Sequence, residues 1–138
     1  MSNHQEPIII DTCGWIEWLT DDVLCDKYAP WFEQMDAVVV PTSIQFELYK
    51  WVCRAKNKQM ALEAIALTKQ GIVLPLSTSI ALLAADVGAE YKLSFADAII
   101  YASAQVSKAV LITSDDHFEG LPNVVYFSKK RMSKVKRC

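Results

Sequence analysis

Four acidic residues stand at positions from which their carboxylates could meet in one cleft. Asp11 directly follows the apolar run Ile8–Ile10, and Asp115 closely follows another apolar run. Glu47 lies just beyond the first turn of a predicted helix, and Asp97 lies at the start of another. Because an open parallel sheet binds ligands outside the carboxyl ends of its strands, all four side chains could reach the same rim.

Such a cluster needs a positive charge or protons to persist. Two like charges about 4 Å apart repel each other by ~4 kcal/mol at an effective dielectric constant of 20. Oxygen-only ligands favour hard divalent ions, so the cofactor expected here is Mg²⁺ or Mn²⁺. An ion held by a few carboxylates and by water suits phosphodiester hydrolysis. The pattern therefore predicts a hydrolase whose metal ligands are Asp11, Glu47, Asp97 and Asp115.

The first two acids also have purely structural interpretations. Asp11 could act only as the cap of the helix that follows it, and either Asp11 or Thr12 could be that cap. Glu47 could form a surface ion pair with Lys50, which lies three residues further along the same predicted helix.

The other acids have structural interpretations as well. Asp97 could complete a capping box with Ser94, and Asp115 and Asp116 could be turn residues. Because Asp116 is adjacent to Asp115, it remains a possible fourth ligand. His117 suggests a general base, but a single histidine in a turn is more often an exposed polar residue.

Other chemistries find less support in the sequence. The four cysteines are widely scattered and form no Cys-x-x-Cys pair, which argues against a zinc site and a disulfide framework and fits reduced thiols: Cys13, Cys25, Cys53 and Cys138. No nucleotide-binding glycine motif, His-Glu-x-x-His or Gly-x-Ser-x-Gly occurs. The four tryptophans have helical spacing, which is more typical of a core or a dimer interface than of base stacking: Trp15, Trp18, Trp31 and Trp51.

Strand patterns alternate with helix patterns along the whole chain. The predicted strands are residues 7–10, 36–40, 72–74, 109–113 and 124–127. One helix is predicted to begin directly after Asp11, and five more are predicted over residues 27–34, 42–54, 57–70, 77–91 and 94–107. Thr42–Gln45 is a capping-box pattern, and Gly71 is expected at the C′ position of the helix before it. This alternation predicts an α/β fold with a mostly parallel sheet that helices cover on both faces.

Length and composition indicate one domain and exclude several classes of protein. The chain has 138 residues, of which 52% are apolar and 22% are charged, enough for one core. No apolar stretch approaches the ~20 residues that span a membrane, and the first residues lack a signal-peptide pattern. We therefore expect a cytoplasmic protein that does not act in a membrane.

The last ten residues differ in charge from the rest. Residues 129–138 contain six of the fourteen basic residues and no acid, so the other 128 residues carry eight basic and sixteen acidic residues, a net charge of −8. Such a basic tail is either a solvated terminus or a grip for an anionic partner such as RNA. Its basic residues are Lys129, Lys130, Arg131, Lys134, Lys136 and Arg137.

Four segments together resemble a known family, the PIN-domain ribonucleases. Residues 8–16 (Ile-Ile-Ile-Asp-Thr-Cys-Gly-Trp-Ile) resemble the family's opening strand, although Cys13 stands where Ser or Thr is common. Residues 43–48 are similar to the helix that carries the second acid, and residues 93–104 to the segment of the third acid. Residues 111–121 resemble the family's Thr-x-Asp-x-x-Phe element, whose spacing favours Asp115 over Asp116 as the fourth acid.

This resemblance implies a fold, a site and partners. The implied fold is a three-layer α/β/α sandwich with a five-stranded sheet over residues 1–128, followed by the basic tail 129–138. The implied function is an Mg²⁺- or Mn²⁺-dependent endoribonuclease that uses Asp11, Glu47, Asp97 and Asp115. The short chain further resembles VapC-type toxins, which are homodimers that cleave RNA and are inhibited by a small antitoxin protein. The alternatives are a PIN nuclease of RNA processing without an antitoxin, and a catalytically idle PIN-like module that binds RNA or protein.

Overall fold

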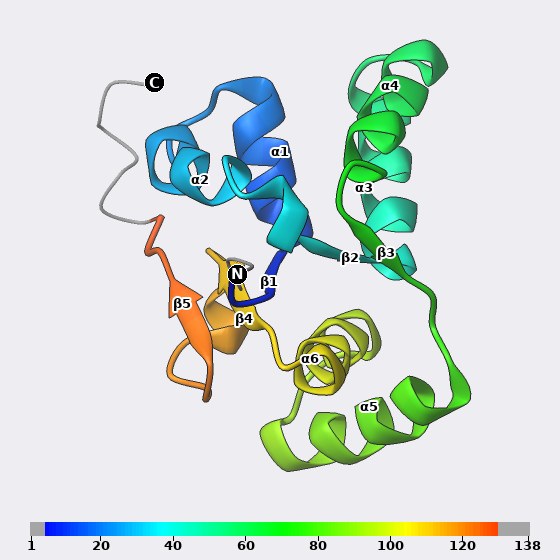
Figure 1. The fold of residues 1–138 in the computed structure, drawn as a ribbon, viewed down its shortest axis with the longest axis vertical. Coiled ribbons are helices and arrows are strands. Elements are labelled where there is room, and N and C mark those ends of the chain that lie inside the picture. The colour runs from blue at the N-terminus through cyan, green and yellow to red at the C-terminus, as the bar shows by residue number, and fades with distance from the viewer. Residues whose placement is uncertain (1–4, 130–138) are drawn as a thin grey trace, which may run out of the picture.

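Five short parallel strands form the centre of the part of the chain that the structure describes, residues 5–129 (Figure 1). In this computed structural model the strands are β1 (Ile8–Ile10), β2 (Val39–Pro41), β3 (Ile72–Leu74), β4 (Val110–Thr113) and β5 (Val124–Tyr126). Strand β4 pairs with β1 and β5, and β2 pairs with β3. A parallel bridge between Ile8 and Val38 connects these two groups, so the strand order is β3-β2-β1-β4-β5.

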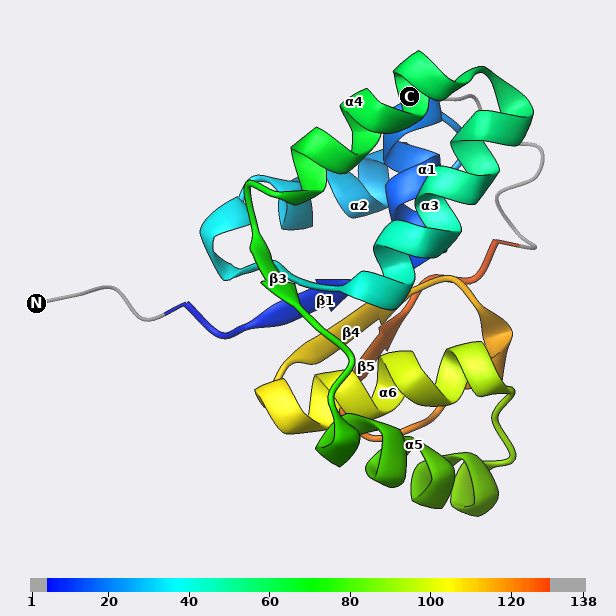
Figure 2. The same cartoon turned by 90° about the vertical axis from the view of Figure 1, so that its right-hand side faces the viewer.

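Helices cover both faces of this sheet, which makes the three layers of the predicted sandwich. Figure 2 shows α1 to α4 on one side of the strands and α5 and α6 on the other. Their bounds are α1 (Thr12–Thr20), α2 (Cys25–Phe32), α3 (Thr42–Ala55), α4 (Lys58–Thr68), α5 (Thr78–Tyr91) and α6 (Phe95–Ser107). The predicted fold class, a three-layer α/β/α sandwich, is therefore confirmed.

The most buried elements are those that have neighbours on two sides. All of β1 is buried, as expected for a central strand of a parallel sheet with helices on both faces. Helix α6 is buried at every position from Ala98 to Ala104, since it lies between the sheet and α5. No helix within residues 5–129 has both the length and the apolar character needed to cross a membrane.

Two local predictions are wrong, while the predicted caps Ser77 and Ser94 are confirmed. Thr42 does not cap α3, because Pro41 ends β2 and is itself the N-cap, so Thr42 already lies in the helix. Gly71 is not at C′, because α4 ends at Thr68 with Lys69 as its C-cap. A glycine is needed at 71 for space, since a Cβ there would lie 2.5 Å from the backbone oxygen of Val38.

The end of the described chain contacts the first helix. The Glu17 carboxylate is 3% exposed, and its Oε1 accepts a hydrogen bond from the backbone N–H of Leu24 at 2.8 Å. Its Oε2 pairs with Nζ of Lys129 at 2.5 Å. The predicted basic tail begins at Lys129, and its remaining residues, 130–138, lie outside the described residues.

Gly14 permits the close approach of α1 to its neighbours, and an alanine there should destabilise the fold. A Cβ at this position would lie 2.5 Å from Cε1 of Tyr28 and 2.6 Å from Cγ2 of Ile10, both of them fully buried side chains. We expect Gly14→Ala to lower the free energy of unfolding by about 1–3 kcal/mol, as measured by urea denaturation. Gly88→Ala is the matched control, because its Cβ would meet only Ala98 at 3.2 Å and Leu93 at 3.6 Å. A larger loss in the control than in Gly14→Ala would contradict this account.

Candidate active site

The structure brings the four predicted acids to one cavity of about 240 Å³. They arrive from four segments: the end of β1, the second turn of α3, the first turn of α6 and the residues after β4. The cavity is lined by Asp11, Glu47, Asp97 and Asp115, together with Thr12, Cys13, Ile16 and Trp51. Asp116 is exposed and does not line it.

Asp11 is the most buried of the four carboxylates, with 5% of its surface exposed. As N-cap of α1, its Oδ1 accepts a hydrogen bond from the backbone N–H of Thr12 at 2.8 Å, and its Oδ2 accepts one from Oγ1 of Thr113 at 2.8 Å. These bonds favour the charged form, but burial opposes it more strongly. Burial, together with the negative charges of Asp115 and Asp97, raises the pKa of Asp11 to about 7.

The Thr113 hydroxyl connects the first acid to the fourth. Besides donating to Asp11, Oγ1 of Thr113 accepts a hydrogen bond from the backbone N–H of Asp115 at 2.9 Å. The Thr-x-Asp spacing therefore fixes the chain leaving β4 against the carboxyl end of β1. It also directs Asp115, and not Asp116, to the cavity.

Glu47 contacts the cavity wall through Thr12. Oγ1 of Thr12 donates a hydrogen bond to Oε1 of Glu47 at 2.7 Å. Burial raises the pKa of Glu47, and the charges of Asp97 and Asp115 add to this shift. Lys50, the alternative partner considered from the sequence, has its Nζ 5.8 Å from the ring centroid of Phe46.

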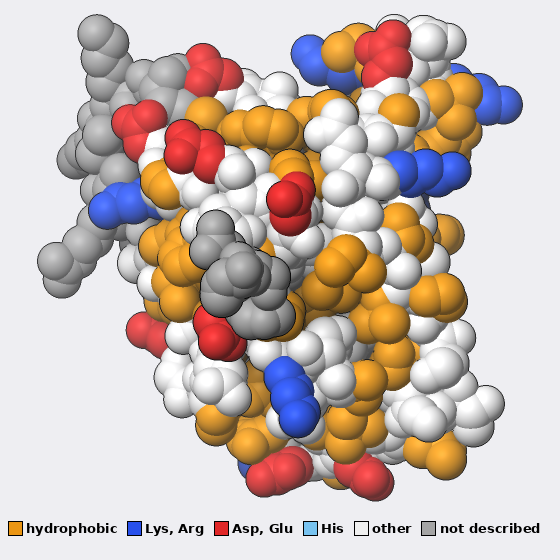
Figure 3. All heavy atoms as spheres, viewed as in Figure 1, with side chains coloured by type: hydrophobic (Ala, Val, Ile, Leu, Met, Phe, Trp, Pro, Cys, Tyr) orange, Lys and Arg blue, Asp and Glu red, His pale blue; other side chains and the backbone are white. Residues whose placement is uncertain are grey.

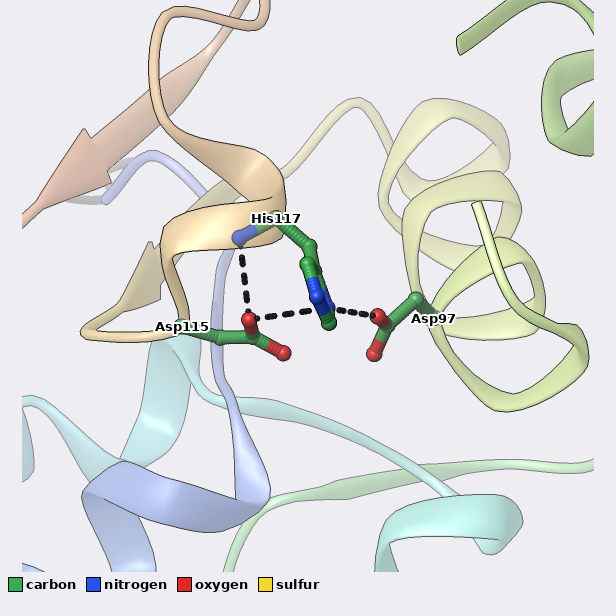
Figure 4. Close-up of side chains that lie close together, drawn as sticks. All are labelled: Asp97, Asp115 and His117. Atoms are coloured by element: carbon green, nitrogen blue, oxygen red, sulfur yellow. Dashed lines mark hydrogen bonds and ion pairs between the residues drawn. The ribbon is translucent and has the colours of Figure 1, made fainter. Parts of the chain in front are cut away.

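His117 joins Asp97 to Asp115 in a way that the sequence analysis missed (Figure 4). Its Nδ1 lies 3.1 Å from Oδ2 of Asp97 and 3.2 Å from Oδ1 of Asp115. The hydrogen bond to Asp97 and the two negative charges raise the pKa of His117, whereas burial and the charge of Asp115 raise the pKa of Asp97. The side chain is 68% exposed, as expected for a turn residue. The sequence feature that could have indicated this contact is the position of His117, two residues after Asp115.

A small polar group lies behind Asp11. The Cys13 thiol lies 3.7 Å from Oδ2 of Asp11 and 3.4 Å from Oγ of Ser114. Oη of Tyr28 donates a hydrogen bond to the same Ser114 hydroxyl at 3.0 Å. Burial raises the pKa of the Cys13 thiol, so this group stays neutral and supports Asp11 without adding charge. The hydrogen bond that a serine would give at position 13 is thus replaced by a longer thiol contact.

The donor set of the cavity fits a divalent cation. Ligand atoms of Asp97, Asp115 and His117 all lie within 4.8 Å of one another. The carboxylates of Asp11 and Glu47 line the same cavity, and burial there raises the pKa of each by disfavouring its charged form, which a bound cation would stabilise. Carboxylate oxygens are the ligands that Mg²⁺ and Mn²⁺ prefer, so these residues could hold either ion.

Comparisons with known proteins agree with this fold. The profile of the PIN domain family matches residues 8–123, so the chain belongs to this family. No curated protein sequence matches the chain.

Solved structures of similar fold come from toxin–antitoxin systems. A toxin–antitoxin complex from Klebsiella pneumoniae aligns with a TM-score of 0.73 and 24% identity, covering 86% of this chain and 95% of that one. DNA-bound VapBC from Salmonella typhimurium aligns with a TM-score of 0.70 and 15% identity, covering 89% and 98%. VapC20 from Mycobacterium tuberculosis, described as a toxin that cleaves the sarcin–ricin loop, aligns with a TM-score of 0.65 and 16% identity, covering 89% and 91%.

Burial of Asp11 should make the metal-free protein less stable as pH rises. Its folded-state pKa of about 7 exceeds that of an unfolded aspartate, so the folded state binds the extra proton between about pH 4 and pH 7. The contribution of Asp11 to the free energy of unfolding is fully present below about pH 4 and is lost as the pH rises through about 7. The loss is at most about 4 kcal/mol, which corresponds to a difference of about three units between the folded and unfolded pKa. Asp11→Asn removes this loss, so the variant should gain stability relative to wild type as pH rises.

The measurement is urea unfolding of both proteins in a chelator across pH 4–8. Adding Mn²⁺ at pH 7.5 should then stabilise wild type more than the variant, because a ligand that binds the folded state adds to its stability. A difference between wild type and Asp11→Asn that stays constant with pH would show that Asp11 ionises as it does in an unfolded chain.

Proposed function

We propose that this PIN-domain protein is a metal-dependent endoribonuclease and the toxin of a toxin–antitoxin pair. The observation that carries the proposal is the convergence of four carboxylates on one cavity, those of Asp11, Glu47, Asp97 and Asp115. The described activity of VapC20, a structure of similar fold, supports RNA as the substrate.

In this proposal the carboxylates hold Mg²⁺ or Mn²⁺, and neighbouring hydroxyls keep them in place. A bound ion would activate water and neutralise the charge that develops on a phosphodiester during hydrolysis. Thr113 orients Asp11 and the Asp115 backbone, and Thr12 orients Glu47. Burying these acids costs folding free energy. A module that only binds RNA or protein does not need four acids in one cavity, so their presence favours the enzyme over the idle alternative.

Basic side chains near the cavity favour a phosphate-bearing substrate. Lys50 and Arg54 are exposed on α3, the helix of Glu47, and the exposed Lys56 follows directly. Figure 3 shows further Lys and Arg side chains on the part of the surface where α3 and α4 lie, in a view that does not show the acid cavity. Because the body of the chain is acidic, these positive charges would draw an RNA backbone toward the site.

Loss of one proposed ligand should abolish most cleavage. Asp97→Asn keeps the side-chain volume and a hydrogen-bonding group but removes a negative charge from the cavity. We expect its single-turnover rate on a mixed RNA pool with Mn²⁺ to fall by at least ~10²-fold, because transition-state charge is no longer fully neutralised. Asp115→Ala should be similarly inactive.

Asp116→Ala is the matched control, since it removes an acid from the same turn without changing the cavity lining. It should keep most of the activity. Full activity of Asp97→Asn would show that Asp97 serves only in the cap of α6. An inactive Asp116→Ala together with an active Asp115→Ala would show that Asp116, and not Asp115, is the fourth ligand.

A groove beside the acids offers a surface for the antitoxin. It has a volume of about 380 Å³ and is lined mainly by apolar side chains of α1, α3 and α4. Ile16 and Trp51 line both the groove and the acid cavity, so the two are adjacent. A short apolar segment of a partner protein bound in this groove would therefore lie next to the acids and obstruct them. The homodimer that the family resemblance implies would use another surface, and exposed Phe95 lines an apolar hollow between α5 and α6.

A charge placed in the groove should separate inhibition from activity. Met60 lines the groove and is 44% exposed, so Met60→Glu should weaken binding of the purified product of an adjacent small reading frame by at least ~10-fold while cleavage persists. Leu62→Glu is the control, since Leu62 is 49% exposed on the same helix but does not line the groove. Equal binding by both variants would place the partner elsewhere, and a gene without such a neighbour would favour the RNA-processing alternative.

A further inference from the structure

The imidazole of His117 lies beside the carboxylates of Asp97 and Asp115. It is the one nitrogen donor that the described residues place within the metal-sized group of Asp97, Asp115 and His117. The backbone N–H of His117 donates to Oδ1 of Asp115 at 3.0 Å, which fixes the start of the side chain beside that acid. Figure 4 shows the ring pointing between the two carboxylates, which come from the start of α6 and the turn after β4.

The two separations between Nδ1 of His117 and the carboxylate oxygens match those between neighbouring ligands of a single ion, and all three donor atoms lie within 4.8 Å of one another. In an octahedral site with ligands about 2.1 Å from the ion, neighbouring ligand atoms lie about 3.0 Å apart. Nδ1 of His117 lies 3.1 Å from the oxygen of Asp97 and 3.2 Å from that of Asp115. To share an ion with both carboxylates, the ring has to lose its Nδ1 proton and turn its lone pair from the carboxylate oxygens toward the ion, and its 68% exposure leaves it free to make that adjustment.

We propose that Nδ1 of His117 is a ligand of the divalent ion, together with Asp97 and Asp115, and that it makes the site prefer Mn²⁺ to Mg²⁺. This inference rests on the metal site of the proposed function and adds a nitrogen donor to its four acids. Imidazole suits transition-metal ions, whereas Mg²⁺ prefers oxygen ligands and gives up its water reluctantly. A site of carboxylates alone would discriminate less between the two ions.

The test compares metal binding and a spectroscopic signature in the full chain. Titration calorimetry gives the Mn²⁺ and Mg²⁺ affinities of wild type and His117→Ala, and pulsed electron paramagnetic resonance of bound Mn²⁺ detects coupling to ¹⁴N. We expect His117→Ala to lose Mn²⁺ affinity by at least the ~10-fold that follows loss of a single supporting group. Its Mg²⁺ affinity should change much less, and the nitrogen signal of wild type should vanish.

Glu119→Gln is the control, because it removes a charge from an exposed position next to the same turn without touching the three donors. It should keep both the Mn²⁺ affinity and the nitrogen signal, and metal-free thermal unfolding checks that each variant folds. Undiminished Mn²⁺ affinity in His117→Ala, or no nitrogen coupling in wild type, would show that the ring is only a counter-charge that the ion displaces. Absence of Mn²⁺ binding to wild type would overturn the inference and the proposed metal site together, which distinguishes the two failures.

Discussion

The burial of an ionisable carboxylate at the end of β1 is the constraint on which the rest of the site depends. Asp11 caps α1, and it accepts the Thr113 hydroxyl from the end of β4. Those two contacts also place two of the other acids, because Thr12 of α1 binds Glu47 and Thr113 binds the backbone of Asp115. A change in the position of Asp11 would therefore displace α1, the Glu47 side chain of α3 and the chain that follows β4 together, because all three are connected to it by hydrogen bonds.

Structural and functional roles coincide at these positions. Asp11 is both a helix cap and part of the cavity wall, and Asp115 caps the short 3₁₀ turn that carries His117. Asp97 lies in the first turn of α6. The amino end of a helix carries a partial positive charge that stabilises a nearby carboxylate, so a helix start tolerates an acid better than most buried positions. For Asp11, Asp97 and Asp115, a structural role at the start of a helix or turn thus explains how the site can exist and does not compete with it.

Apart from the capping box at Thr42, sequence reasoning succeeded where local chemistry decides, and it failed where residues far away in the chain decide. Apolar runs predicted the strands, and Ser77 and Ser94 predicted helix starts, because these features depend on a few adjacent residues. The roles of Gly71 and His117 depend on residues far away in the chain, the backbone oxygen of Val38 and the carboxylate of Asp97. The convergence of the four acids on one cavity could be predicted because strand ends of a parallel sheet meet at one edge, a rule that joins distant segments without knowledge of their contacts.

Folding and ion binding act in opposite directions on the same carboxylates. Folding removes Asp11 from water and favours its protonated form, whereas a cation binds only the charged form. Ion binding below about pH 7 therefore has to release the proton that burial retains on Asp11. The charges of Asp97 and Asp115 raise the pKa of Asp11 further, so each additional acid increases both the cost of the metal-free state and the attraction for the ion. The surrounding hydroxyls and the imidazole moderate that cost, since they are donors to the acids without being acids themselves.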